Sequence, residues 1–220
     1  LHEKLNFNFV SDIAPVASIV RLPYVMLAHP SVPANTVPEF IAYAKANVGK
    51  ITMASSGIGT GPHLAGELFK MMAGVDMVHI PYRGAGPALN DLLGGQVRAS
   101  FSGIAASIEY VRTGKLRALA VSAESRSDAL PDIPPLADFL AGYEASGWYG
   151  IGAPRNTPPA IVAKLNREVN AGLADPRIKG RLVDLGGTVL PGSPADFAKV
   201  IADETEKWAR VIKFSGAKAH

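Results

Sequence analysis

The stretch ITMASSGIGTGPHLAGELFKMM, residues 51–72, decides the fold. Residues 51–54 are typical of a short buried strand, and residues 55–61 form a loop of small residues. Residues 63–72 then repeat their apolar positions at helical spacing. A strand that turns into a helix through such a loop directs unpaired backbone N–H groups, and the positive end of the helix dipole, at a small open space. This arrangement favours the binding of an anion.

The loop supplies room and donors for that anion. Glycines remove side chains that would block the approach of the backbone, and hydroxyls add donors: Gly57, Gly59 and Gly61, and Ser55, Ser56 and Thr60. An alternative interpretation is an ordinary strand–helix turn in which Thr60 merely caps the helix. The spacing alone leaves both interpretations open.

Composition narrows the class of protein. The chain has 220 residues, of which 48% are hydrophobic and 19% charged, as is ordinary for a globular protein that buries a real core. The net charge of +3 comes from scattered basic residues, so we expect no nucleic-acid partner. Cysteine is absent, which excludes disulfides and thiolate catalysis. No apolar run is long enough to span a bilayer.

Strands and helices alternate along much of the chain. A short strand is predicted at Tyr24–Ala28, and further strands at residues 77–80 and 97–101 each lead into a small-residue turn, at residues 82–86 and 102–105. This order predicts a mainly parallel α/β sheet. Turns that follow parallel strands gather at the carboxyl edge of the sheet, where ligands bind.

The sequence offers little for catalysis. The histidines have no metal-site spacing, there is no G-x-S-x-G motif, and the lysine of a P-loop is missing after Gly61. His63, in the first helical turn, is interpreted either as a ligand contact or as a local cap that packs. We therefore expect binding rather than catalysis and no cofactor or metal. A small α/β enzyme that uses His63 or His79 on an anionic substrate remains an alternative, as does a fragment that acts by protein association.

Several segments, in this order and spacing, resemble one family: FVSDIAPVASIV, HPSVPANTVPEFIAYAKAN, ITMASSGIGTGPHLAGELFKMMAGVDMVHIPYRGAGPALNDLLGGQV, GKLRALAVSAESRSDALPDIPPLADF and GWYGIGAPRNTPPAIVAKLNREV. They are similar to the Bug-type extracytoplasmic solute receptors of tripartite tricarboxylate transporters, over essentially the whole chain. The resemblance implies a periplasmic protein of the type II periplasmic-binding-protein fold, in which two α/β domains joined by hinge strands close on a small carboxylate. It also implies membrane permease subunits as partners.

The resemblance also implies where the domains and the site lie. Residues 1–22 and 147–220 would form the remainder of one domain, and residues 23–146 a compact second domain. The hinge strands would pass near Val20–Tyr24 and Trp148–Gly150. The ligand-binding residues would be Ser55, Ser56, Gly57, Gly59, Thr60, His63, Tyr82, Arg83, Gly84, Ser102 and Gly103.

Two departures from the family carry expectations. Relatives begin with further βα units that this chain lacks, so we expect an N-terminally incomplete outer domain and self-association through an unpaired sheet edge. Many relatives carry Asp where this chain has Ser102. A carboxylate there pairs with a ligand ammonium more strongly than a hydroxyl does, so Ser102 favours a carboxylic acid without an amino group.

Overall fold

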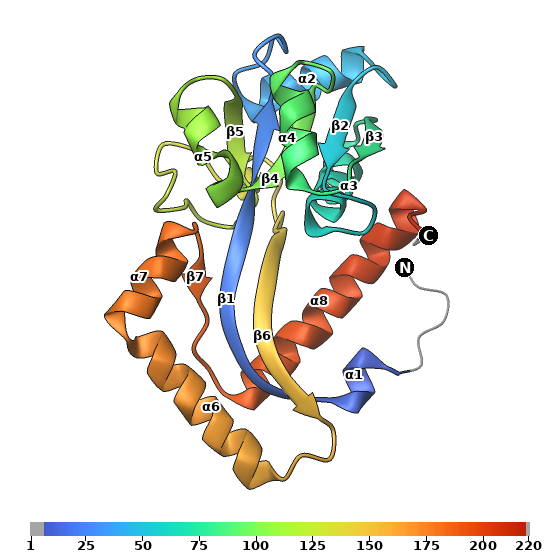
Figure 1. Ribbon diagram of the computed structural model, residues 1–220. Coiled ribbons are helices and arrows are strands. Elements are labelled where there is room, and N and C mark those ends of the chain that lie inside the picture. Colours follow the sequence, from blue (N-terminus) through green and yellow to red (C-terminus); the bar gives the residue numbers. More distant parts are fainter. Residues whose placement is uncertain (1–6, 219–220) are drawn as a thin grey trace.

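One long strand, β1 (Ile13–Ala28), runs the length of the molecule (Figure 1). The computed structural model describes residues 7–218. Around the upper half of β1 lie β2 (Thr52–Ser55), β3 (Val78–Pro81), β4 (Ala99–Gly103) and β5 (Arg117–Val121). The lower half of β1 pairs with β6 (Ser146–Pro154) and β7 (Thr188–Val189).

The sheet is mixed rather than mainly parallel, so the predicted strand directions were partly wrong. The strand order is β3-β2-β4-β1-β5, and β2 is parallel to β3 and β4 as expected. β1, in contrast, is antiparallel to β4, β5 and β6. The prediction missed this because β1 enters the sheet from the lower half of the molecule and is not part of a strand–helix–strand repeat.

β1 is also far longer than the predicted strand at Tyr24–Ala28, because its prolines do not interrupt pairing. The pairing of β1 with β7 ends at Arg21, and its pairing with β4 starts at Tyr24. Pro23 lies between these two paired segments. Pro15 lies where the register with β6 shifts. A proline, which lacks an N–H donor, is tolerated at such gaps in a ladder.

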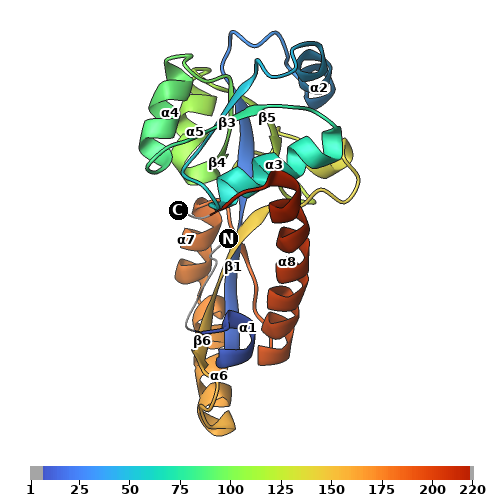
Figure 2. The same ribbon diagram turned by 90° about the vertical axis from the view of Figure 1, so that its right-hand side faces the viewer.

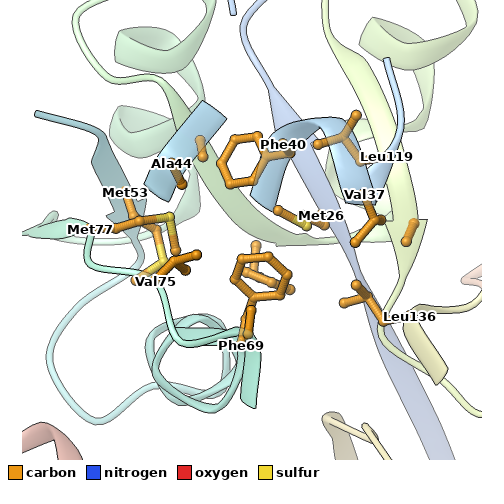
Figure 3. Close-up of a cluster of buried hydrophobic side chains, with 14 of the residues drawn as sticks. Met26, Val37, Phe40, Ala44, Met53, Phe69, Val75, Met77, Leu119 and Leu136 are labelled. Atoms are coloured by element: carbon orange, nitrogen blue, oxygen red, sulfur yellow. The ribbon is translucent and has the colours of Figure 1, made fainter. Parts of the chain in front are cut away.

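Helices cover both faces of the upper sheet: α2 (Val37–Ala46) and α3 (Gly61–Ala73) on one face, α4 (Ala85–Leu93) and α5 (Ile104–Arg112) on the other. Alternation along β1 places Met26 in the first cluster and Val25 and Leu27 in the second. Figure 3 shows the first cluster, in which Phe40 of α2 and Phe69 of α3 face each other across a ring distance of 6.1 Å. Two separate cores therefore share one strand.

The remaining helices surround the lower half: α1 (Phe9–Asp12), α6 (Pro159–Ala174), α7 (Pro176–Asp184) and α8 (Pro194–Ser215). A 3-10 turn at Leu136–Asp138 belongs to the upper half, where Leu136 lies in the first cluster. Figure 2 shows α8 rising along one side of the molecule to α3. Its lower end packs Phe197 edge-on against Trp148 at 5.8 Å, and its upper end places Val211 in the cluster with Phe69. α1 and β7 were not predicted.

A partly buried ion-pair network ties α8 to the strands beside it. The carboxylate of Glu144, just before β6, lies 3.0 Å from Arg21 Nη1 of β1 and 2.6 Å from Lys207 Nζ of α8. Lys207 Nζ is also 2.8 Å from Glu204 Oε1, and Glu204 accepts a hydrogen bond from the indole N–H of Trp208 at 2.7 Å. Each buried charge in the network therefore has an opposite partner.

The predicted hinge segments lie side by side, because Val20 pairs with Tyr149 and Arg21 with Trp148. The division of the chain into residues 1–22 with 147–220 and residues 23–146 stays a prediction. Residues 1–6 lie outside the described part of the chain.

We expect Phe69→Ala to lower the free energy of unfolding by about 3–5 kcal/mol, because it leaves a cavity in a close-packed cluster. Phe69 is fully buried, whereas Phe214 is 52% exposed. Phe214→Ala is therefore the matched control and should change the free energy by no more than about 0.5 kcal/mol. Urea unfolding followed by circular dichroism measures both, and equal losses would contradict the assignment of Phe69 to the core.

Candidate functional site

Three strand–helix turns meet at the carboxyl edge of the upper sheet, as the sequence predicts. The turn after β3 is hydrogen-bonded directly to the turn after β2: the N–H of Tyr82 donates to Ser55 O at 3.0 Å and that of Gly84 to Ser56 O at 3.2 Å. β4, which pairs with β2, brings Ser102 and Gly103 to the same edge.

A small hollow, with about 20 Å³ of room for a water-sized group, lies where these turns converge. Its lining combines hydroxyls with small and apolar groups: Ser56, Pro62, Ala85, Ala88, Leu89, Ser100, Phe101, Ser102 and Gly103. The predicted residues Ser56, Ser102 and Gly103 are thus brought together. Pro62, Ala85 and Ser100 were not predicted, although each lies within two residues of a predicted one.

Ser102 carries the one lining hydroxyl that, in the described chain, is buried without a hydrogen-bond partner. The residue is 4% exposed. Ser100, two residues earlier on the same face of β4, donates its hydroxyl to Ala54 O at 3.0 Å. A buried, unpaired hydroxyl costs free energy unless something outside the chain completes its bonding. Ser102 therefore marks a position where a ligand oxygen can bind.

The helices that begin at this edge lack side-chain caps. α3, α4 and α5 start at Thr60, Gly84 and Gly103, and none of these residues makes a side-chain cap bond. Of the helices that begin elsewhere, α2, α7 and α8 are capped by Thr36, Asp175 and Ser193, whereas α6 starts without a side-chain cap bond. First-turn N–H groups without a cap remain available to an anion.

Thr60 does not cap α3, so the alternative interpretation of the turn is not supported. Its hydroxyl instead donates to Gly57 O at 2.7 Å, across the loop. The N–H groups of Gly61 and His63, in the first turn of α3, have no hydrogen-bond partner among the described residues.

The loop glycines have structural roles that differ from the predicted one. Gly57 and Gly59 adopt φ of 133° and 76°, which side-chain-bearing residues rarely tolerate. Their N–H groups are engaged inside the loop, by Ser55 Oγ at 3.2 Å and by His63 Nδ1 at 3.0 Å. A Cβ on Gly61 would come within 1.8 Å of the hydroxyl oxygen of Tyr24.

His63 and His79 lie behind the loop rather than in its opening. Their rings stack at 3.9 Å with an interplanar angle of 14°, and His63 is 4% exposed. The fully buried Ser55 joins them, because its hydroxyl lies 2.6 Å from His79 Nε2. Sequence reasoning could not find this stack, since the two rings come from separate elements.

Both histidines favour the neutral form. Burial lowers the pKa of His63, with a further contribution from the positive charge of Lys70. Burial, His63 and Lys70 together lower the pKa of His79 to about 4. Glu67, which lies 3.8 Å from His63 Nε2 and 3.1 Å from Lys70 Nζ, has a pKa raised by burial.

The side chains of Tyr82 and Arg83 take no part in the hollow. The hydroxyl of Tyr82 donates to Asp91 Oδ2 at 2.6 Å, and burial together with this carboxylate raises the pKa of Tyr82 to about 12. Arg83 is exposed, and its guanidinium forms no ion pair within residues 7–218. Neither residue lines the hollow.

Tyr24 packs against the start of α3, a contact that sequence reasoning missed. Its ring lies against Gly61 and Gly147, where an added Cβ would come within 1.8 and 2.9 Å of its hydroxyl oxygen. Burial raises the pKa of Tyr24 to about 12. The nearest sequence signal was its place next to Pro23, at the predicted hinge.

Two kinds of feature, a metal cluster and a membrane-crossing helix, are absent from the described residues. No group of three or more His, Asp or Glu side chains is arranged to hold a metal ion in the part of the chain described here. Within that same part, no helix combines the length and apolar character that a membrane crossing needs.

Comparison with known proteins assigns the family. The model of the tripartite tricarboxylate transporter family receptor matches residues 1–217. Protein BugT of Bordetella pertussis is 34% identical over 219 residues, which is 99% of this chain and 67% of BugT. The chain thus spans about two thirds of this relative's length.

Solved structures of similar proteins share the fold. An R. palustris protein solved with adipate has a TM-score of 0.86 at 32% identity, covering 99% of this chain and 73% of its own. MatC from Rhodopseudomonas palustris, with bound malate, gives 0.81 at 31% identity, covering 95% and 72%. The periplasmic binding protein BugD gives 0.82 at 32% identity, covering 100% and 75%. The fold is therefore that of these α/β binding proteins, whose family consists of receptors rather than enzymes. The chain belongs to the tripartite tricarboxylate transporter receptor family.

Proposed function

We propose that this protein is a solute receptor that holds a small carboxylate at the junction of the three turns. The observation that carries the proposal is the buried, unpartnered hydroxyl of Ser102 beside uncapped helix ends. Similar proteins solved with adipate and with malate support the class of ligand.

The mechanism we infer is capture by neutral donors. The N–H groups of Gly61 and His63, and the hydroxyls of Ser56 and Ser102, surround a carboxylate held at the start of α3 and α5. Hydrogen bonds to a charged acceptor are about twice as strong as those between neutral groups, so no cationic side chain is needed. Exclusion of water strengthens each bond further.

We propose that capture involves closure of two domains, residues 1–22 with 147–220 and residues 23–146, about the paired strands β1 and β6. The hinge segments Val20–Tyr24 and Trp148–Gly150 support this, because they are the neighbouring parts of those strands. By its family, the receptor would act in the periplasm and deliver its ligand to membrane permease subunits.

We expect Ser102→Ala to weaken carboxylate binding about 10- to 100-fold, because one charge-assisted hydrogen bond of about 1.5–3 kcal/mol is lost. The same change removes an unpaired hydroxyl, so the stability of the ligand-free protein should not fall. Isothermal titration calorimetry with malate and adipate, and urea unfolding, measure the two effects.

Ser100→Ala is the matched control, because Ser100 lines the same hollow but already donates to Ala54 O. It should cost about 1 kcal/mol of stability and leave affinity nearly unchanged. Equal loss of affinity in the two variants would contradict a direct role for Ser102.

We expect malate to bind more tightly than aspartate, which differs from it by an ammonium in place of a hydroxyl. Ser102 offers this ammonium no carboxylate partner, so an amino acid loses hydration without an ion pair in return. Competition calorimetry of the two acids measures the preference, and tighter binding of aspartate would overturn it.

We also propose self-association through the lower half of the molecule. Within residues 7–218, β6 pairs only with β1, and it exposes Tyr149 (57%) and Ile151 (39%) on the same side of the strand. Unpaired strand edges and exposed apolar groups favour association. Light scattering should show dimers or larger species that Ile151→Lys disrupts, whereas a monomer at high concentration would refute the proposal.

A further inference from the structure

The rings of His63 and His79 do not line the hollow, yet they contact loop 55–60 near both of its ends, at Ser55 and at Gly59. We propose that His63 and His79 are positioning residues that hold loop 55–60 in its binding conformation only while both rings are uncharged. The inference rests on the proposed function, because it takes loop 55–60 as part of the carboxylate site.

His63 fixes the far end of the loop through a bond that demands a neutral ring. Its Nδ1 accepts the N–H of Gly59 at 3.0 Å, so the ring proton must be on Nε2, which lies 3.8 Å from Glu67 Oε1. A second proton on Nδ1 would place two N–H donors against each other. Protonation of His63 therefore breaks the contact that fixes Gly59.

His79 fixes the near end through Ser55. His79 Nε2 lies 2.6 Å from Ser55 Oγ, and this hydroxyl is 3.2 Å from both the N–H and the carbonyl oxygen of Gly57. Whether His79 Nε2 accepts from or donates to the Ser55 hydroxyl therefore determines which bond this hydroxyl makes to Gly57. Thr60, whose hydroxyl donates to Gly57 O, depends on the same segment.

The surroundings oppose charge on either ring. The ring of His79, from β3, stacks on the ring of His63, from α3, at 3.9 Å. A positive charge on one ring therefore disfavours a positive charge on the other. Lys70 of α3 adds a positive charge that lowers the pKa of both. Glu67 is the acidic group that faces His63. Burial raises the pKa of Glu67, its pairing with Lys70 lowers this pKa, and the negative charge of Asp76, from the turn after α3, adds to the rise.

The direction of the pH effect follows from these lowered pKa values. The loop is intact above the ordinary histidine pKa of 6.5 and loses its contacts as the pH falls toward the folded-state pKa, about 4 for His79. Carboxylate affinity should therefore weaken in acid by more than the protonation of the acid itself explains.

The decisive variant is His63→Asn, because Asn Oδ1 accepts a hydrogen bond from the same position as Nδ1 and cannot become charged. His63→Leu removes the acceptor. Malate affinity is measured by calorimetry between about pH 8 and about pH 4, because the pKa of His79 is lowered to about 4. Protonation of malate affects all variants alike, so the difference between variants isolates the histidine.

We expect wild-type affinity to fall about tenfold more than that of His63→Asn over this range, and His63→Leu to bind weakly throughout. His79→Gln, which keeps a polar group near Ser55, should retain affinity at about pH 8. His29→Asn is the control, because His29 contacts Ser31 rather than the loop, and its pH profile should match the wild type. Identical profiles for wild type and His63→Asn would overturn the proposal.

A second measurement needs no ligand. The amide signal of Gly59 in the NMR spectrum of the free protein should shift, and its hydrogen exchange accelerate, as the pH falls in the wild type but not in His63→Asn. An unchanged Gly59 signal overturns the positioning role even if malate binds. If no acid binds at about pH 8 while the Gly59 signal behaves as expected, the proposed function fails and the histidine contact stands.

Discussion

The structure depends on the continuous pairing of β1. Above Pro23 the strand is held between β4 and β5, and its alternating side chains, Met26 against Val25 and Leu27, supply both hydrophobic clusters. Below Pro23 the same strand pairs with β6 and β7. Since one backbone serves both halves, the pairing of β1 and the contacts of α8 together place the hollow relative to the lower half.

The candidate site gains its character from groups that the chain leaves unpaired. A helix start usually carries Ser, Thr, Asp or Asn to satisfy its first amides, as Ser193 does for α8 through a capping box. At the carboxyl edge of the sheet the corresponding residues are Gly84, Gly103 and a Thr60 that bonds elsewhere. Together with the Ser102 hydroxyl, these ends are the donors that we propose bind the carboxylate.

The sequence predicted the helix at residues 63–72 and the small-residue turns, because apolar periodicity and small-residue runs are local signals. It predicted that residues near Ser56, Gly84 and Ser102 would meet, since turns after parallel strands share an edge. It could not predict the direction of β1, which depends on pairing with strands far along the chain. Nor could it place His63 against His79, or show that the N–H groups of Gly57 and Gly59 are satisfied within the loop, because such contacts appear only once the chain is folded.

The helix α8 spans the two halves of the molecule, with Phe197 against the lower strands and Val211 in the upper core. Between them, Glu204 and Lys207 join it to Glu144 and Arg21 through opposite charges. A rotation about β1 and β6 must therefore be small enough to preserve these contacts or must rearrange them. In the domain closure that we propose, the contacts of α8 therefore limit the amplitude of the movement.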